Sequence, residues 1–265
     1  LKLVGKELIT PRTADKRLFP IAPVIVFMPV LVGFLVLPFS PDLIIRDMNV
    51  GVLLIFAFST FTVLAILAGG WASNNKYALL GAMRAAAQMV SYELPLVLAI
   101  VSPALAAGSL SLVGIATAWT PWWLLWQLPG MFVFLAAAVA ELQRPPFDMP
   151  VADSEIVFGP YTEYSGLRFA FLLLAEYAGI VVFSLLFAVL FLGGWAGPFT
   201  GVDGGALGWL WTLLKGFVIA VVIIWFRVAW PRLREDQLQR FAWVVLVPLA
   251  LLQLAITAVG VVMMQ

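Results

Sequence analysis

The sequence predicts an all-α protein that folds as a polytopic transmembrane helix bundle. Its 265 residues are 63% hydrophobic and only 11% charged, whereas soluble domains are about 25% charged. The mean hydropathy is +1.06, and the apolar residues occur in runs of about 20, the length that a helix needs to cross a bilayer. No internal repeat or low-complexity tail is visible, so we expect residues 1–265 to form a single integral membrane domain.

About seven apolar runs are long enough to cross a membrane. Glycine, proline or clustered polar residues lie between them, which is typical of the connections between spans. In order along the chain, the predicted spans cover residues 20–38, 50–69, 89–107, 122–140, 169–192, 209–230 and 241–263.

The connecting segments have distinct compositions. Residues 71–88 follow Gly69-Gly70 and are predicted to form an amphipathic helix, because their larger apolar side chains recur about one turn apart. The 108–121 segment carries no charge and is predicted to be a loop. The 193–208 segment is rich in glycine and is also predicted to be a loop.

The basic residues are distributed unequally between the two sides of the predicted bundle. Seven spans would place residues 1–19, 70–88, 142–168 and 227–240 on one side, and these segments hold all but two of the fifteen Lys and Arg residues. The other side holds only Arg46 and Lys215. Because cytoplasmic loops carry the excess of basic residues, we expect the 141–168 segment in the cytoplasm and the C-terminus outside.

The composition excludes several kinds of chemistry. The chain has no Cys and no His, so disulfides, thiolate metal sites and histidine general bases are excluded. A net charge of +1 gives no reason to expect nucleic acid binding. Proton chemistry in this chain must therefore use carboxylates.

The 141–168 segment gathers acids beside one of the predicted spans. Prolines in its first part exclude a long helix there, and its aromatic residues are too numerous for a freely solvated loop. We interpret it as a cavity wall or partner interface, with a solvated acidic loop as the alternative. The acids of this segment are Glu141, Asp148, Asp153, Glu155 and Glu163, and the residues expected beside them are Arg144, Phe147 and Tyr161.

Two further acids fall inside predicted spans, where ionisable residues are costly and are typical of functional sites. Glu93 lies near the start of the third span, and Glu176 is the deepest acid in the chain. Glu141 and Arg144 have the i,i+3 spacing of an ion pair on a helix, which would close a helix end or tune a proton site. These residues indicate either a proton-handling membrane subunit or a transporter.

Several motifs closely resemble one known family. The residues that carry the resemblance are WASNNKYALLGAMRAAAQMVSYELPL at 71–96, ELQRPPFDMPVADSE at 141–155, TEYSGLRFAFLLLAEY at 162–177, FLGGW at 191–195 and WPRLREDQLQRFAWVVLVPLAL at 230–251. They resemble the H subunit of bacterial NADH-quinone oxidoreductase, respiratory complex I. The resemblance runs with gaps over almost the whole chain.

This resemblance implies a membrane-arm subunit in the bacterial inner membrane that walls a chamber for its quinone substrate. It implies two kinds of partner. The peripheral quinone-site and iron–sulfur subunits would carry the FMN and iron–sulfur clusters, and small membrane subunits would lie next to this chain. A chain of buried carboxylates would couple quinone reduction to proton translocation. The motif positions rich in those acids correspond to Glu93, Glu141, Asp148, Glu155 and Glu163; Arg144 matches the motif arginine.

The chain departs from the family pattern in places. Val151 and Asp153 replace two usual glutamates, and Val244 stands where a lysine is common. The first residues resemble the segment that follows the family's first helix, so we expect that helix to be missing. Alternatives are the related subunit of a membrane-bound hydrogenase or ferredoxin-linked complex, and a secondary transporter; the absence of internal repeats disfavours the transporter.

Overall fold

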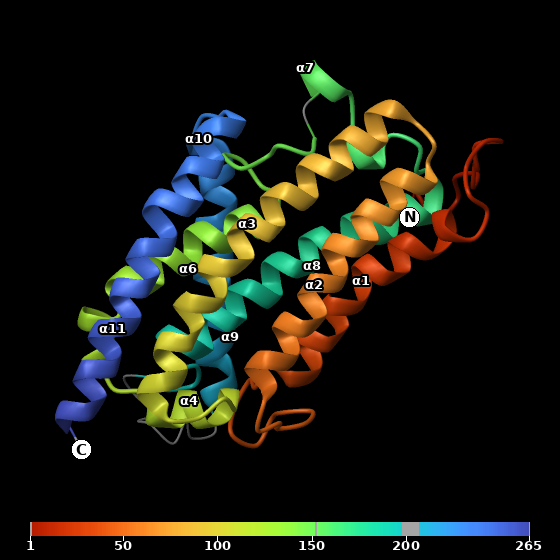
Figure 1. The fold of residues 1–265 in the computed structure, drawn as a ribbon. Helices are drawn as coiled ribbons and strands as arrows, with labels where there is room; N and C mark the ends of the chain where they lie inside the picture. The colour runs from red at the N-terminus through yellow and green to blue at the C-terminus, as the bar shows by residue number, and fades with distance from the viewer. Residues whose placement is uncertain (1, 152, 198–206, 265) are drawn as a thin grey trace.

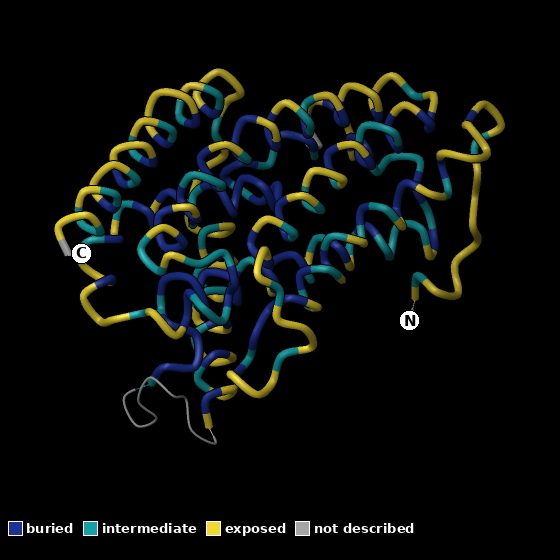
Figure 2. The backbone as a smooth tube through the Cα atoms, turned by 60° about the horizontal axis from the view of Figure 1, so that its bottom comes forward, coloured by how far each residue is buried: buried dark blue, intermediate teal, exposed yellow. Residues whose placement is uncertain are grey.

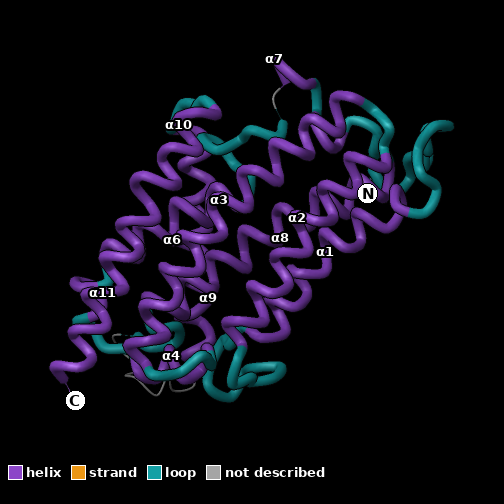
Figure 3. The backbone as a smooth tube through the Cα atoms, in the orientation of Figure 1, coloured by secondary structure: helices purple, strands orange, loops and turns teal. Residues whose placement is uncertain are grey.

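The computed structural model describes residues 2–151, 153–197 and 207–264. Over these residues the chain is a bundle of helices joined by loops, the longer of which follow α1 and α6 (Figures 1 and 3). In chain order the elements are α1 (Leu18–Val36), α2 (Gly51–Ala72), α3 (Lys76–Ala107), α4 (Leu112–Ala118), α5 (Trp123–Trp126), α6 (Leu128–Glu141), α7 (Asp153–Ile156), the 3₁₀ turn η1 (Gly159–Tyr161), α8 (Gly166–Phe191), α9 (Gly208–Ala229), α10 (Glu235–Arg240), the π turn η2 (Phe241–Leu246) and α11 (Val247–Met264).

The predicted all-helical membrane bundle is confirmed. Within the described residues, six helices are long and apolar enough to cross a membrane: α1, α2, α3, α8, α9 and the run Glu235–Met263 that joins α10 to α11. Their outer faces remain apolar and exposed, as in Phe217 (70% exposed) and Val228 (82% exposed) of α9. The buried residues lie along the middle of the bundle, and the exposed ones lie on the outside (Figure 2).

Three predicted boundaries were wrong. The amphipathic segment 71–88 is not a separate helix, because α3 continues from Lys76 through the third predicted span to Ala107. Its alanine-rich sequence favours helix propagation, and Asn75 caps its start by accepting a hydrogen bond from the Tyr77 N–H (3.0 Å).

The other two corrections concern the fourth span and the loop before it. The predicted span 122–140 is divided into α5 and the 14-residue α6. Pro129 lies at the start of α6, where its missing N–H and fixed φ favour the beginning of a new helix. The segment 108–121 is not entirely a loop, since it contains α4, whose first turn is capped by the Ser111 hydroxyl.

Helix α3 occupies the centre of the bundle and contacts α2, α6 and α11, while α8 contacts α1 and α9. The four segments that together hold all but two of the Lys and Arg residues, and that include α7 and α10, lie at one end of the bundle (Figure 1). The loop after α1, α4 and the C-terminus lie at the other end (Figure 1). The Lys and Arg residues that the predicted spans assigned to one side of the membrane therefore lie at one end of the folded bundle.

One of the two basic residues at this second end has a defined partner. The Lys215 ammonium of α9 donates hydrogen bonds to the carbonyls of Leu192, Gly194 and Ala196, at 2.5–2.8 Å. These carbonyls follow the C-terminus of α8, where a cation also interacts favourably with the helix dipole. Lys215 thus provides hydrogen-bond donors for backbone carbonyls just beyond α8, inside an otherwise apolar bundle.

Candidate functional site

A largely apolar cavity lies between α1, α2 and α8, close to the start of the acidic segment. Its wall is built from all three helices, with Met89 of α3 and the 141–143 and 161 positions closing one side. The polar residues that line it are Ser59, Thr62, Glu141, Gln143, Tyr161 and Glu176. An apolar pocket with a few convergent polar groups is the usual form of a site for an apolar ligand with a polar head.

Three predicted site residues, Glu141, Tyr161 and Glu176, therefore meet at one cavity. They come from α6, η1 and α8, which are separated by up to 35 positions in the chain. Glu141 is 8% exposed, and its Oε2 atom has no hydrogen-bond partner among the described residues. A buried carboxyl oxygen without a partner is costly, which is a reason to expect that it meets a ligand, water or proton there.

The anticipated ion pair between Glu141 and Arg144 is not formed, and this prediction was wrong. The Nε atom of Arg144 lies 3.2 Å from Oε1 of Glu176, and the guanidinium lies over the Tyr177 ring, 4.5 Å from its centroid. Helix α6 ends at Glu141, and Gln143 has a φ of +52°, so the chain leaves the helical path before Arg144. The i,i+3 spacing consequently does not put the two side chains together.

Two titratable groups of the 141–168 segment, Asp148 and Tyr161, keep their protons more strongly than usual. Burial is the main cause that raises the pKa of Asp148, and Arg232 opposes this shift. Burial, followed by the negative charge of Glu176, raises the pKa of Tyr161. Tyr161 therefore remains a hydroxyl that can donate a hydrogen bond into the cavity.

Phe147 packs inside the protein and does not line this cavity. Its ring lies 5.3 Å from the Tyr92 ring in an edge contact and 6.3 Å from the Phe241 ring in a stacked one. The Gln88 amide donates to the carbonyls of Ala140 (2.7 Å) and Phe147 (2.6 Å). These contacts fix the first part of the acidic segment between α3 and the last helix.

The remaining acids of the segment hold it to α3. Glu163 accepts a hydrogen bond from the Asn75 side chain (2.6 Å). Glu155 pairs with Arg84 (2.6 Å), and this hydrogen bond lowers the pKa of Glu155. The side chain of Asp153 lies outside the described residues.

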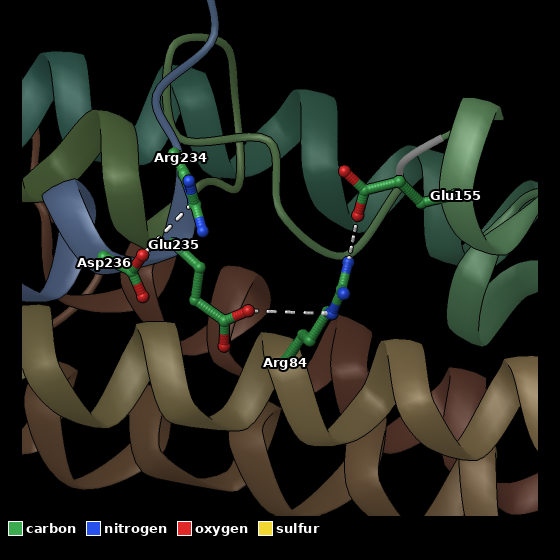
Figure 4. A network of polar contacts seen from close by, with 5 residues as sticks. All are labelled: Arg84, Glu155, Arg234, Glu235 and Asp236. Carbon is green, nitrogen blue, oxygen red and sulfur yellow. Dashed lines mark hydrogen bonds and ion pairs between the residues drawn. The ribbon is translucent and has the colours of Figure 1, made fainter.

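A charged cluster surrounds Arg84 at the same end of the bundle (Figure 4). Arg84 of α3 points toward Glu155 on one side and toward Glu235 of α10 on the other, at 2.6 and 3.9 Å, and Arg234 pairs with Asp236 at 3.2 Å. The partners of Arg84 are about half exposed, so each pair contributes little stability. The cluster joins α3, α7 and α10.

Glu93 faces a different region from the cavity. It accepts a hydrogen bond from Thr60 of α2 (2.8 Å) and lines a groove between α2 and α3 that Gln239 also lines. The structure therefore separates the predicted site residues into a cavity group, a group that holds the loop, and Glu93 on the outer surface.

Several cavity residues were missed from the sequence. Ser59 and Thr62 line the wall from α2, and their signal was the run Ser59-Thr60-Phe61-Thr62 inside an otherwise apolar span. Gln143 gave no signal beyond its place in the acidic segment. In the part of the chain that the structure describes, no group of three or more acids could hold a metal ion.

A model of the NADH dehydrogenase family matches residues 1–258, a range that includes every cavity-lining residue. The chain belongs to the NADH dehydrogenase family. This membership confirms the resemblance inferred from the motifs at 71–96 and 141–155.

Relatives within the NADH dehydrogenase family are similar over nearly the whole chain. The H subunit of the NADH-quinone oxidoreductase of Geobacillus kaustophilus is 49% identical over 261 residues, which cover 98% of this chain and 78% of the relative. The proteins of the same name from Geobacillus thermodenitrificans and Bacillus mycoides are 48% and 49% identical, over 98% and 97% of this chain and 78% and 77% of the relatives.

Proposed function

We propose that this chain is the membrane-embedded H subunit of a proton-translocating NADH-quinone oxidoreductase and that its cavity forms part of the quinone chamber. The observation that carries the proposal is the meeting of Glu141, Tyr161 and Glu176 in an otherwise apolar cavity. An isoprenoid quinone has an apolar tail and a ring with two carbonyl acceptors. The apolar walls from α1, α2 and α8 suit the tail, and the Tyr161 hydroxyl suits a ring carbonyl.

The second part of the proposal is that buried carboxylates couple quinone chemistry to proton translocation. Glu141 and Glu176 face the cavity, and Glu176 is held by Arg144. A change of charge at the quinone would alter the balance between Glu176 and Arg144. Moving one charge against 100 mV requires about 2.3 kcal/mol, an energy that one such rearrangement can supply. Glu93, Glu155 and Glu163 would extend or support this path.

The proposed function requires partner subunits. The chain has no Cys or His, so the FMN and iron–sulfur clusters that carry electrons from NADH would reside on other subunits. The charged cluster around Arg84 would face the peripheral quinone-site and iron–sulfur subunits. The Glu93 groove between α2 and α3 would lie in the membrane arm, next to the small membrane subunits.

Filling the cavity tests the proposed quinone chamber. Ala175 of α8 lines the cavity and is 6% exposed, so Ala175→Phe in the assembled complex should place a ring in the space proposed for quinone. We expect the KM for quinone to rise roughly tenfold, a loss of about 1.4 kcal/mol in binding. NADH oxidation with an artificial acceptor that does not need the chamber should be unchanged.

Leu174→Phe is the matched control, because Leu174 precedes Ala175 on α8 but is 51% exposed. It should leave the KM for quinone unchanged. If the Ala175→Phe complex assembled fully and kept the original KM for quinone, the proposal that this cavity forms part of the quinone chamber would be refuted.

The orientation in a bacterial cell membrane is part of the same proposal. The excess of Lys and Arg at the end that carries α7 and α10 favours the cytoplasm for this end and the outside for the C-terminus. The chain lacks Cys, so single cysteines can be introduced at two exposed sites, Asp42→Cys and Thr13→Cys. An impermeant maleimide should label the first in intact cells and the second only in inverted vesicles. The reverse pattern would exclude this orientation.

A further inference from the structure

The last transmembrane helix is interrupted by a π turn. Helix α10 ends at Arg240, the π turn η2 covers Phe241–Leu246, and α11 continues from Val247. The Val247 N–H bonds to the carbonyl of Ala242, five residues earlier instead of four. Such single-turn π segments contain one residue more than the α-helix requires and are less stable than α turns.

The segment before the π turn is attached to α3 and to the acidic segment. The Tyr92 hydroxyl donates to the Leu238 carbonyl (2.9 Å). The Phe147 ring contacts Tyr92 on one side and stacks on Phe241, the first residue of the turn, on the other. The loop that bounds the cavity therefore contacts the π turn directly.

The segment after the π turn is fixed independently. The hydroxyls of Thr257 and Ser102 are hydrogen-bonded at 2.6 Å, and the Gln253 amide donates to the Trp126 carbonyl (2.9 Å). Gln253, Thr257 and Ser102 are 0% exposed. Hydrogen bonds between buried side chains are the main polar means of fixing one transmembrane helix against another.

The extra residue allows both attachments to face the core. Leu238, Ala242, Leu246 and Ala250 recur every four residues and are all 0% exposed. In a regular α-helix, four residues turn about 40° beyond a full rotation, so such a row would drift away from α3. The wider π turn offsets that drift between its two fixed ends.

We propose that η2 is a joint that lets the α10 segment move with the Phe147 loop and the turn of α3 that carries Tyr92, while α11 stays fixed to α5 and to the part of α3 that carries Ser102. Movement of the acidic segment would pass through Phe147 and Tyr92 into the backbone before the turn. The π turn would absorb the resulting rotation by changing its hydrogen bonds. The coupling role rests on the proposed function, but the placement of the extra residue does not.

Two single-residue deletions test this inference in the full complex. Deleting Val244, which lies in the turn and is 61% exposed, should convert η2 to α-helix and leave both attachments in register. We expect wild-type assembly and unchanged thermal stability, with coupled turnover lowered roughly tenfold because the joint has become rigid. Deleting Ile256, which is 47% exposed and lies between Gln253 and Thr257 in α11, should rotate Thr257 by about 100° relative to Gln253. The π turn cannot absorb this shift, so the deletion should abolish assembly.

A third variant gives a readout that packing alone would not produce. Tyr92→Phe removes the bond to Leu238, so it should lower coupled turnover in the wild-type background and have no further effect when Val244 is deleted. The proposed joint would be refuted if the complex that lacks Val244 kept wild-type turnover and pumping. It would also be refuted if the losses caused by the Val244 deletion and by Tyr92→Phe were additive. Failure of the Val244 deletion to assemble would overturn the placement of the extra residue. Assembly does not depend on quinone, so these results are separable from the Ala175→Phe test of the chamber.

Discussion

Arg144→Met is expected to lower the free energy of unfolding by about 3–5 kcal/mol, the range measured when one partner of a buried ion pair is removed. The Arg144 side chain is 6% exposed, and its Nε lies 3.2 Å from Glu176. Without the guanidinium, the Glu176 carboxylate would lie in an apolar cavity with no cation among its close contacts. The cation–π contact with Tyr177 would also be lost. Thermal denaturation of the purified complex and the yield of assembled complex in membranes measure the effect.

The double variant with Glu176→Gln distinguishes an unpaired charge from a loss of packing. If the unpaired carboxylate causes the instability, Arg144→Met combined with Glu176→Gln should recover most of the lost assembly. Arg168→Met is a matched control in the same segment, since the one side-chain hydrogen bond of Arg168 within the described residues is to the exposed Thr10 hydroxyl, and its guanidinium lies over Phe19. A double variant as unstable as Arg144→Met would mean that the guanidinium acts through its packing.

Glu176→Gln alone tests the proposed proton path. If Glu176 carries protons, this variant should assemble and reduce quinone but pump fewer protons per electron. An unchanged proton-to-electron ratio at an unchanged rate would remove Glu176 from the path.

The helices and the charge asymmetry could be predicted because both depend on local composition. Runs of about 20 apolar residues must cross the bilayer as helices, since no other open structure satisfies their backbone there. The acids Glu141 and Glu176 were found by a similar local argument, their rarity among apolar residues. Helix ends were harder to predict, as α3 illustrates: the apolar periodicity of its first third predicted a helix, but its polar residues hid the fact that this helix continues into the next span.

The contacts of the site could not be predicted, because they join positions far apart in the chain. The spacing of Glu141 and Arg144 suggested a local pair, but the chain turns at Gln143 and Arg144 meets Glu176, 32 positions further on. The π turn was also missed. A continuous apolar segment does not reveal one extra residue, and the reason for it is the attachment of Leu238 and Thr257 to two distant points of α3.

Gln88→Leu is expected to release the acidic segment from α3 and to lower the free energy of unfolding by about 2–4 kcal/mol. Gln88 is 0% exposed, and its amide group is the only donor that reaches the Phe147 carbonyl within the described structure. The Ala140 carbonyl would keep its bond from the Gln143 N–H (3.1 Å). The Phe147 carbonyl would therefore lose its partner, whereas the Ala140 carbonyl would lose only its side-chain donor. Limited proteolysis of the 145–158 region and thermal denaturation measure both consequences.

Gln88→Glu should be more damaging than Gln88→Leu, although it preserves the shape of the side chain. It would place a carboxylate oxygen against two carbonyl oxygens in a buried position, where an unpaired charge is far more costly than a missing hydrogen bond. Gln239→Leu is the control, because Gln239 also binds α3 through its amide but at a less buried position: it donates a longer bond of 3.4 Å to the Ala87 carbonyl and accepts one of 2.9 Å from the Ser91 hydroxyl. If Gln88→Leu and Gln239→Leu had equal effects, the acidic segment would be held by its aromatic packing on Tyr92 and Phe241, and the amide of Gln88 would contribute little to its position.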